Sequence, residues 1–540
     1  MDDVAALRIE SGVAAIFSAF DRRDRPGAAV GIMRNGRMIM RRGFGMASIE
    51  HGVAITPNTV FRIASVTKQF VAGGIVMLDR EGVLSVNDPL SKWNEDLPHL
   101  GDHVTLAQLA RNTSGLRDLL ELSRLQGMDL ERLMSAEELM AVIHGQAELN
   151  FAPGSEFLYC NTGFNLLGKV IERATGKPLA DFLRERFFLP AGMNQTQLTP
   201  TTDTVVPNLA TGYMGEPEEG YRQALHGYPL GGEGGLVSSL DDLLIWSRHY
   251  KQGFVGGAGF ADRCLDAGSY TDGEPAEYGY GLFHGRYRGL RTISHGGQWP
   301  GFRTEFLVMP EIDLSVVVIS NLGVFDPFAA GRRIVDVVLA ADPPAVAVRP
   351  IPKPPSKEAA LARTGLYVSE AGETLLIGLD RDAPTVWANG VPTALLQEED
   401  DLWEARSAFR RSFAFDRDGV LSTSLMGGPP QRFTRMAPIE VLPDGLEGVY
   451  RSPEMDTIWR FQRNAEGAMT VSVEGPIMRR AGWPVVPVQP DLFWVKNPLR
   501  WLAAMLDVRL VRADNGEILG LSVSGGRAKA VYFARLPQEP

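Results

Sequence analysis

The sequence predicts an α+β domain, in which helices pack on an antiparallel sheet, followed by two small antiparallel β domains. Three observations lead to this prediction. Strand-like and helix-like segments occur in blocks rather than in strict alternation, a proline-rich stretch divides the chain, and two similar strand-rich segments follow it. The chain also has 540 residues, more than the ~250–300 residues that one hydrophobic core usually supports, so several domains are expected.

The first block opens with a helix, a hairpin and a second helix. Residues 4–20 carry apolar side chains at helical spacing. Two strand-like runs then flank Asn35-Gly36, and this dipeptide is the strongest short signal for a β-hairpin. From Ser65 to about Gly82 the apolar residues return to helical spacing, which predicts the second helix.

The remainder of the first block predicts helices in its middle and strands near its end. A last helix is expected at 326–339, because Asp326 suits the N-cap and Pro327 suits the first helical position. This order of strands, helices and again strands is typical of helices packed on an antiparallel sheet. The other expected helices are 106–111, 135–145, 161–174 and 179–188, and the expected strands are 291–295, 303–309 and 314–320.

The proline-rich stretch at 341–356 predicts a stiff, extended linker. We therefore expect one domain at 1–340 and two more at 357–440 and 443–540. The last two contain a weak repeat, which fits two similar antiparallel barrels or sandwiches, with chance similarity as the alternative. The repeat consists of Gly365-Leu366-Tyr367 followed by Ser369, Glu373 and Thr374, and of Gly448-Val449-Tyr450 followed at the same offsets by Ser452, Asp456 and Thr457.

Composition and charge exclude several classes of partner. The net charge of −11 repels phosphate backbones and anionic membrane surfaces, so neither nucleic acid nor membrane is expected as a partner. The first residues lack the basic and apolar regions of a signal peptide, which favours a cytoplasmic protein. Two cysteines, Cys160 and Cys264, give neither a disulfide framework nor a metal cluster, and a reduced pair is expected.

Ser65 and Lys68 form an S-x-x-K tetrapeptide at the start of a predicted helix. Residues three apart lie on the same helical face, so the Lys68 ammonium can reach the Ser65 hydroxyl. A serine needs such help, because its hydroxyl is a weak nucleophile at neutral pH, and the helix N-terminus favours negative charge there. Taken alone, the pattern fits a capping serine and an exposed lysine better than an active site.

Tyr159 and Asn161 form a Y-x-N pattern on a loop just before a helix. A tyrosine oxygen near Ser65 can relay a proton, and its pKa can fall beside a lysine cation. The Asn161 amide can hold a substrate carbonyl. The alternative interpretation is a buried tyrosine followed by an asparagine N-cap.

His295, Gly297 and Gln298 lie on a predicted strand. A glycine lets a second backbone approach closely, and the N–H of Gln298 can form an oxyanion hole with that of Ser65. His295 can hydrogen-bond near the tyrosine–lysine pair, although a strand histidine is more often structural. The order S-x-x-K, Y-x-N, H-x-G, at spacings of about ninety and about 130 residues, together predicts a serine hydrolase.

No metal or cofactor is expected. The eight histidines are scattered without the paired spacing of zinc enzymes. The sequence contains neither a phosphate-binding loop nor a dinucleotide fingerprint. Cys160 is expected to pack beside the site rather than to act as a nucleophile.

These motifs resemble those of the serine β-lactamase and penicillin-binding-protein superfamily, and most of all its D-aminopeptidase branch. The similar stretches are SVTKQF, PGSEFLYCN, FLPAGM and the final GEILGLSVSGGRAKAVYFARL. The resemblance implies a β-lactamase-like α+β domain, two eight-stranded antiparallel barrels, and a homodimer. It also implies release of N-terminal D-residues from short peptides, amides and esters.

The resemblance also implies a role for each site residue. Ser65 would be the acylated nucleophile, Lys68 would give and take its proton, Tyr159 would be the partner of Lys68, and His295 would assist from the strand. Which of Lys68 and Tyr159 takes the first proton is disputed across such enzymes.

One stretch departs from the D-aminopeptidase pattern. In that branch a loop of the last barrel, here 476–486, enters the active site and an acidic residue on it meets the free amine of the substrate. This loop has no acid: Ala481 occupies about that position, beside Arg479 and Arg480. If the loop enters the site, the arginines would repel an ammonium and attract a carboxylate; otherwise they point to solvent.

Two alternatives therefore stand beside a D-aminopeptidase. A D,D-carboxypeptidase, β-lactamase or esterase on the same scaffold is favoured by the missing acid, whereas the missing signal peptide opposes a role in the cell wall or on lactams. A binding protein or sensor, with an inert or permanently acylated serine, is opposed by the three intact motifs.

Overall fold

The computed structural model describes residues 3–129, 131–399, 402–407, 409–416, 419–499 and 504–537. It divides into two compact units. Segment 113–162 is grouped with the C-terminal part, and the domain bounds expected from the sequence stay predictions. The first unit comprises Met1–Asn112, Gly163–Ser269 and Pro275–Ile351, and the second comprises Thr113–Thr162, Tyr270–Glu274 and Pro352–Pro540.

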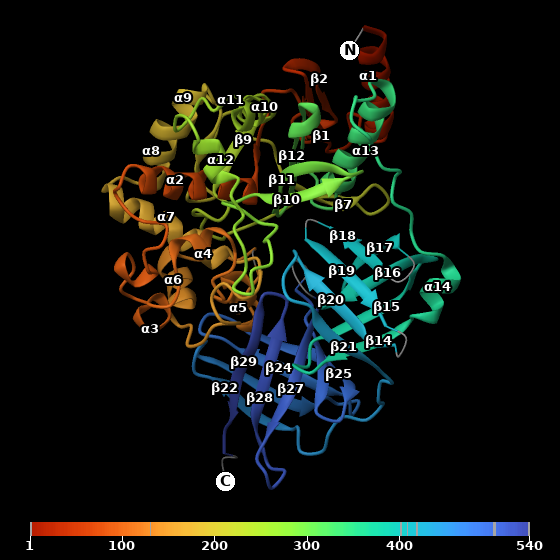
Figure 1. Ribbon diagram of the computed structural model, residues 1–540. Coiled ribbons are helices and arrows are strands. Elements are labelled where there is room, and N and C mark those ends of the chain that lie inside the picture. The colour runs from red at the N-terminus through yellow and green to blue at the C-terminus, as the bar shows by residue number, and fades with distance from the viewer. Residues whose placement is uncertain are drawn as a thin grey trace. The chain divides into compact units, whose positions relative to one another are not determined.

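The first unit is built on a six-stranded antiparallel sheet in the order β10-β11-β12-β13-β1-β2 (Figure 1). Asn35 and Gly36 form the turn between β1 and β2 with φ of 51° and 71°, which confirms the predicted hairpin. The strands near 291–320 are also confirmed, and β11 is longer than expected. The bounds are β1 Ala28–Arg34, β2 Arg37–Phe44, β10 Phe283–Tyr287, β11 Leu290–Trp299, β12 Phe302–Met309 and β13 Leu314–Ser320.

Helices cover both faces of this sheet. On one face α1 (Asp3–Phe17) and α13 (Pro327–Ala341) share a buried apolar cluster with the strands. On the other face α10 (Leu240–Ser247) packs so closely that a Cβ at Gly31 would lie 2.5 Å from a methyl group of Leu244. Both terminal helices confirm predictions, including Asp326, whose side chain accepts a hydrogen bond from the Ala329 N–H at 2.9 Å.

The middle of the chain is helical, as expected. The segment after Ser65 forms one 3-10 turn, η1, before the α-helix α2 begins at Lys68. The predicted helices at 106–111, 135–145, 161–174 and 179–188 are confirmed, the last of them continuing as a π-helical turn. The helical elements of this region are η1 Ala64–Thr67, α2 Lys68–Arg80, α4 Leu106–Ala110, α5 Leu119–Leu125, α6 Ala136–His144, α7 Asn161–Thr175, α8 Leu179–Leu183 and η3 Arg184–Phe188.

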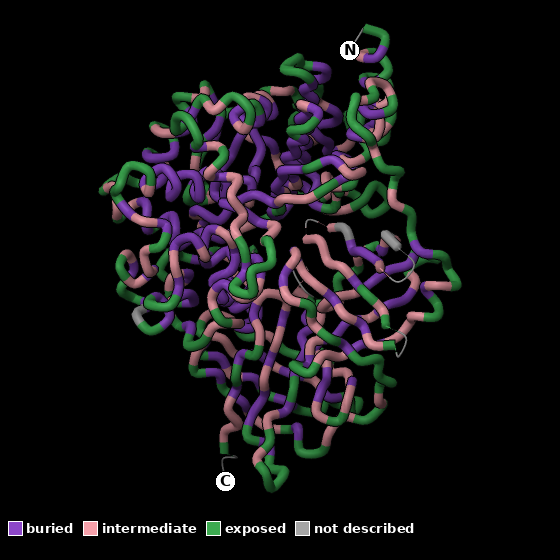
Figure 2. The backbone as a smooth tube through the Cα atoms, viewed as in Figure 1, coloured by how far each residue is buried: buried purple, intermediate pink, exposed green. Residues whose placement is uncertain are grey.

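The second unit contains two closed barrels of eight antiparallel strands each, which confirms the expected architecture (Figure 1). Buried residues occur between more exposed ones along the strands of both barrels (Figure 2). The first barrel consists of β14 Gly365–Ser369, β15 Thr374–Asp380, β16 Ala383–Ala388, β17 Val391–Glu399, β18 Leu402–Arg406, β19 Arg410–Phe415, β20 Leu421–Leu425 and β21 Gln431–Met436. The second consists of β22 Gly448–Ser452, β23 Thr457–Arg463, β24 Met469–Glu474, β25 Arg479–Gln489, β26 Leu492–Lys496, β27 Met505–Arg512, β28 Ile518–Gly525 and β29 Ala528–Arg535.

The sequence repeat covers the first strand of each barrel and extends to the first residue of the second strand. The Tyr367 hydroxyl donates to the carbonyl of Arg363 at 2.8 Å, and the Tyr450 hydroxyl donates to the carbonyl of Leu446 at 2.9 Å. Both contacts span four residues, and both tyrosines are buried. The two copies therefore keep the same local structure as well as the same sequence offsets.

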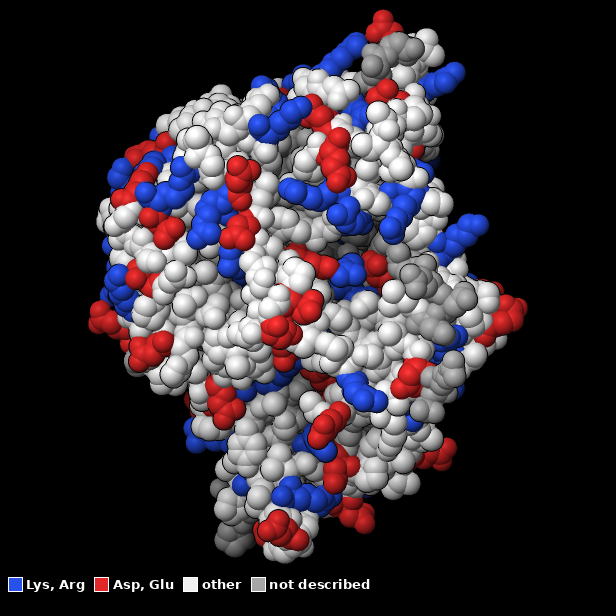
Figure 3. Space-filling model, viewed as in Figure 1, with Lys and Arg blue, Asp and Glu red and all other residues white. Residues whose placement is uncertain are grey.

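On the face drawn in Figure 3, basic and acidic side chains are interspersed. Cys160 and Cys264 are both buried free thiols. Within the described ranges, no helix combines the length and the apolar composition that crossing a membrane requires.

Candidate active site

Ser65 lies in η1, directly before α2, and is partly exposed. The Nζ of Lys68 lies 3.1 Å from the Ser65 hydroxyl oxygen, as predicted from the S-x-x-K spacing. The residue before the serine, Ala64, has a φ of +47°. This left-handed conformation costs a non-glycine residue roughly 1–3 kcal/mol and is common at functional sites, so the chain holds the serine in a strained turn.

Lys68 is fully buried, unlike a lysine on the exposed face of a helix. Its ammonium donates to the backbone carbonyl of Glu233, and it lies 5.3 Å from the centre of the Phe164 ring. The Glu233 carboxylate accepts from the Gly231 N–H at 3.0 Å and from the Asn165 amide at 3.1 Å. Burial raises the pKa of this carboxyl group. The surroundings thus fix the Nζ beside the serine oxygen.

The strand β11 passes close to the turn that carries Ser65. A Cβ at Gly297 would lie 2.2 Å from the carbonyl oxygen of Ile63, so only glycine fits this approach, as the sequence predicted. On its outer edge β11 pairs with β10 from Leu290 to Ser294, while Gln298 pairs with Arg303 of β12. The pairing with β10 ends at Ser294, so the last residues of β11, including the exposed Gln298, extend beyond β10.

His295 is buried on β11 and hydrogen-bonded at both ring nitrogens. Its Nδ1 lies 2.7 Å from the Gly296 carbonyl, which can only accept, so Nδ1 carries the proton. The Nε2 then accepts from the Tyr278 hydroxyl at 3.0 Å. Burial, and next the charge of Lys68, lower the pKa of His295 to about 3. The imidazole is therefore neutral at physiological pH.

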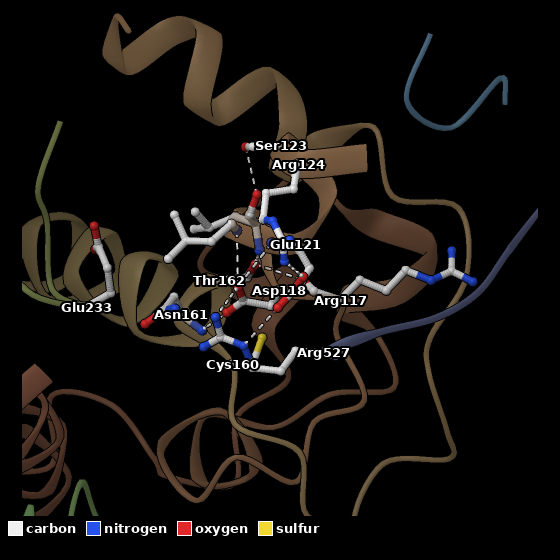
Figure 4. Close-up of polar contacts among 12 residues, drawn as sticks. Arg117, Asp118, Glu121, Ser123, Arg124, Cys160, Asn161, Thr162, Glu233 and Arg527 are labelled. Carbon is white, nitrogen blue, oxygen red and sulfur yellow. Dashed lines mark hydrogen bonds and ion pairs between the residues drawn. The ribbon is translucent and has the colours of Figure 1, made fainter. Parts of the chain in front are cut away.

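Tyr159 and Asn161 belong to the second unit; Tyr159 lies two residues before α7, and Asn161 begins it. The Asn161 N–H donates to the Asp118 carboxylate at 2.6 Å, and the Cys160 thiol donates to the Leu116 carbonyl at 3.3 Å (Figure 4). Asn161 is buried, and the Asp118 carboxylate satisfies its backbone N–H. The turn that carries Tyr159 is thus bound to the segment that begins at Leu116.

The stretch 476–486 lies mostly within the second barrel's sheet. Arg479 and Arg480 begin β25 and pair with Glu474 and Val473 of β24. The Arg480 guanidinium bonds to the Gly127 carbonyl and to the Asp129 carboxylate, whereas Arg479 and Ala481 are exposed. Contact of these three residues with a substrate stays a prediction.

The described part of the chain contains no group of three or more histidine, cysteine, aspartate or glutamate side chains that could hold a metal ion. The structure adds three residues that sequence reasoning did not single out. Glu233 holds Lys68, Tyr278 holds His295, and Asp118 holds the backbone at Asn161. No local motif marks them, because each contacts a residue that is distant in the sequence.

The family model named Beta-lactamase matches residues 13–340. The D-aminopeptidase of Gluconobacter oxydans (strain 621H) is 33% identical over 326 residues, which are 59% of this chain and 60% of that relative. The D-aminopeptidase of Brucella ovis is 34% identical over 297 residues, 55% of this chain and 56% of its own length. The match therefore spans less than two thirds of either relative.

Solved structures share the fold. The D-amino acid amidase from Ochrobactrum anthropi SV3, complexed with L-phenylalanine amide, has a TM-score of 0.52 and 26% identity, and covers 62% of this chain and 98% of its own. The octameric penicillin-binding protein homologue from Pyrococcus abyssi has a TM-score of 0.55 and 24% identity, with 80% and 100% coverage. Because the family model matches more than half of its residues, the chain belongs to the beta-lactamase family.

Proposed function

We propose that the protein is a serine hydrolase that releases N-terminal D-amino acids from short peptides, amides and esters. The observation that carries this proposal is the buried Lys68, whose Nζ lies 3.1 Å from the hydroxyl oxygen of Ser65 at the start of α2. The curated relatives named D-aminopeptidase and the amidase structure support a D-amino acid derivative as the substrate.

The proposed reaction is a two-step acyl transfer. The Ser65 oxygen attacks the amide or ester carbonyl, and Lys68 and Tyr159 carry its proton to the leaving group. The N–H groups of Ser65 and Gln298 stabilise the oxyanion, and the Asn161 amide holds a substrate carbonyl. Water then attacks the acyl-enzyme and restores Ser65.

His295 has a supporting role in this mechanism. Because its pKa is about 3, the imidazole is uncharged near neutral pH. It accepts a hydrogen bond from Tyr278 and stays in one tautomer. It therefore maintains the shape of β11 and leaves proton transfer to Lys68 and Tyr159.

A second candidate is the hydrolysis of N-acylated or carboxylate-bearing substrates. The observation that favours it is the absence of an acid in 476–486, together with the exposed Arg479. An acid at that position would bind a free amine, whereas a guanidinium attracts a carboxylate. In this case the hydrolase chemistry is retained and the specificity differs.

The test compares D-alanine p-nitroanilide with its N-acetyl form and with its L enantiomer. We expect cleavage of the free D substrate, and Ser65→Ala should lower kcat by at least about a thousandfold. Preferred cleavage of the N-acetyl form would support the second candidate. An unimpaired Ser65→Ala enzyme would rule out both.

Two further properties belong to the same proposal. A homodimer is proposed from the resemblance to D-aminopeptidases, and sedimentation velocity of the purified protein tests it. A cytoplasmic location is proposed as well, and fractionation of cells that produce the protein tests it.

A further inference from the structure

The turn between β28 and β29 of the second barrel carries Arg527 to the segment of Cys160 and Asn161 (Figure 4). The backbone makes the first contact, because the Arg527 carbonyl accepts from the Asp118 N–H at 3.1 Å and from the Asn150 amide at 3.2 Å. A Cβ at Gly526 would lie 2.8 Å from a carboxylate oxygen of Glu121. The turn is therefore closely packed against α5.

The Arg527 side chain pairs with two buried carboxylates. Its guanidinium lies 3.5 Å from the Asp118 carboxylate and 3.6 Å from that of Glu121. The side chains of Asp118 and Glu121 are 0% and 4% exposed, and that of Arg527 is 16% exposed. Pairs removed from water to this degree are weakly screened by salt, so the guanidinium is held firmly.

Asp118 connects Arg527 to the turn that carries Tyr159. The same carboxylate that meets Arg527 accepts the hydrogen bond from the Asn161 N–H at 2.6 Å. Nearby, the Thr162 hydroxyl donates to the Arg117 carbonyl at 2.7 Å and accepts from the Leu119 N–H at 2.9 Å. The start of α7 is therefore fixed to the residues that Arg527 contacts.

Arg527 also contacts the Tyr159 ring itself. Its Cζ lies 5.6 Å from the ring centre, within the distance of a cation–π interaction. The ring of Phe409, from the turn between β18 and β19 of the first barrel, meets the Tyr159 ring edge-on at a centroid distance of 5.3 Å. Both barrels thus contribute one side chain to the position of this tyrosine.

We propose that Arg527 is a positioning residue, which fixes the Tyr159 ring and the backbone at Asn161 in the arrangement that proton transfer requires. The inference rests on the proposed role of Tyr159 as a proton carrier. It gives the second barrel a function in the reaction: a hairpin more than 350 residues downstream completes the support of the Tyr159 turn.

The test is a double-mutant cycle on Arg527→Met and Tyr159→Phe. Because a small misplacement of a catalytic group costs up to about a hundredfold in rate, Arg527→Met should lower kcat about 10- to 100-fold and change KM less than about threefold. In the Tyr159→Phe background the same substitution should have little further effect, since the hydroxyl that it positions is gone. An equal loss in both backgrounds would overturn the proposal.

Two variants separate positioning from loss of stability. Arg527→Lys keeps the cation and should recover part of the lost kcat. Gln126→Met is the matched control, because Gln126 also joins segment 113–162 to the second barrel, through a 2.8 Å hydrogen bond to the Met455 carbonyl. It should lower the unfolding temperature without lowering kcat at 25 °C. If Arg527→Lys is as impaired as Arg527→Met, or Gln126→Met loses as much kcat, the positioning role is wrong.

The cycle is measured on two substrates, so that failure of the proposed function can be recognised separately. D-alanine p-nitroanilide reports the proposed activity, and p-nitrophenyl acetate reports acylation of Ser65, which intact mass detects. Acylation by the ester without cleavage of any D substrate would contradict the proposed function, and the cycle on the ester would still decide the role of Arg527.

Discussion

His295 is a titratable residue of the proposed site that its hydrogen bonds and its burial keep uncharged. The Nδ1 proton is donated to the Gly296 carbonyl, and the Nε2 is occupied by the Tyr278 hydroxyl. A protonated ring would instead donate from Nε2 to the Tyr278 oxygen, and its added charge is disfavoured by burial. The folded pKa of about 3 lies below the ordinary value of 6.5. Its contribution to stability is thus complete above pH 6.5 and lost as the pH falls toward 3.

This reasoning predicts that His295 does not titrate between pH 5 and 8. In ¹⁵N-histidine spectra, its nitrogens should keep the shifts of the neutral Nδ1–H tautomer across this range, and the His295→Gln variant identifies the resonance. Tyr278→Phe should leave the ring neutral at pH 7, because burial remains the main cause of the lowered pKa. A His295 midpoint near 6.5 in the wild type would contradict the assignment.

At the scale of elements, the approach of β11 to the turn that carries Ser65 depends on one glycine. A Cβ at Gly297 would lie 2.2 Å from the Ile63 carbonyl oxygen, whereas a Cβ at Gly296 would lie 3.6 Å from its nearest neighbour, the Thr304 carbonyl oxygen. The 3.6 Å distance at Gly296 is an ordinary van der Waals contact. Because the two glycines are adjacent, an alanine at Gly296 is the matched control for an alanine at Gly297.

We therefore expect Gly297→Ala to displace β11 from η1, and to lower kcat/KM at least about a hundredfold by moving the Gln298 N–H away from the oxyanion. Gly296→Ala should keep kcat/KM within a few-fold of the wild type. Steady-state kinetics on the same substrate, with circular dichroism as a check of folding, measure both. Equal activities of the two variants would contradict the proposed place of β11.

The elements that carry Ser65, Lys68 and His295 could be predicted from the sequence because local patterns specify them. The hairpin at Asn35-Gly36 and the N-cap at Asp326 are of the same kind, since turn and cap chemistry acts over a few residues. The motif spacing of Ser65 and Lys68 follows from one helical turn. Such features need no knowledge of the tertiary structure.

The supporting residues could not be predicted, because only packing brings them to the site. Glu233 meets Lys68 across 165 residues through a backbone carbonyl, which any residue type provides. Arg527 lies in the final stretch that resembles the family, but no motif there indicates a role for this one arginine among 54 basic residues. The closure of each β domain into an eight-stranded barrel rather than a sandwich was likewise open from strand patterns alone, because both need the same alternation.

At the scale of the molecule, the two barrels of the second unit are joined through a buried aspartate. Asp507 of β27 accepts hydrogen bonds from the Thr374 hydroxyl at 2.6 Å and from the Thr374 N–H at 3.2 Å, and Thr374 begins β15 of the first barrel. The Trp494 indole of the second barrel donates to it at 3.0 Å. Burial nevertheless raises the pKa of Asp507 to about 7.

The stability of this joint should depend on pH in the direction opposite to that of His295. Between the ordinary pKa of 3.8 and the folded value of about 7, the folded Asp507 keeps a proton that the unfolded chain has lost. Its contribution to the free energy of unfolding therefore falls as the pH rises, by about 1.4 kcal/mol per pH unit within that window. In the difference between the unfolding free energies of the wild type and Asp507→Asn, the contributions of the other titrating groups cancel. We expect denaturant unfolding to show this difference shrinking or reversing in favour of Asp507→Asn between pH 5 and pH 8, and a constant difference would mean that Asp507 is charged throughout.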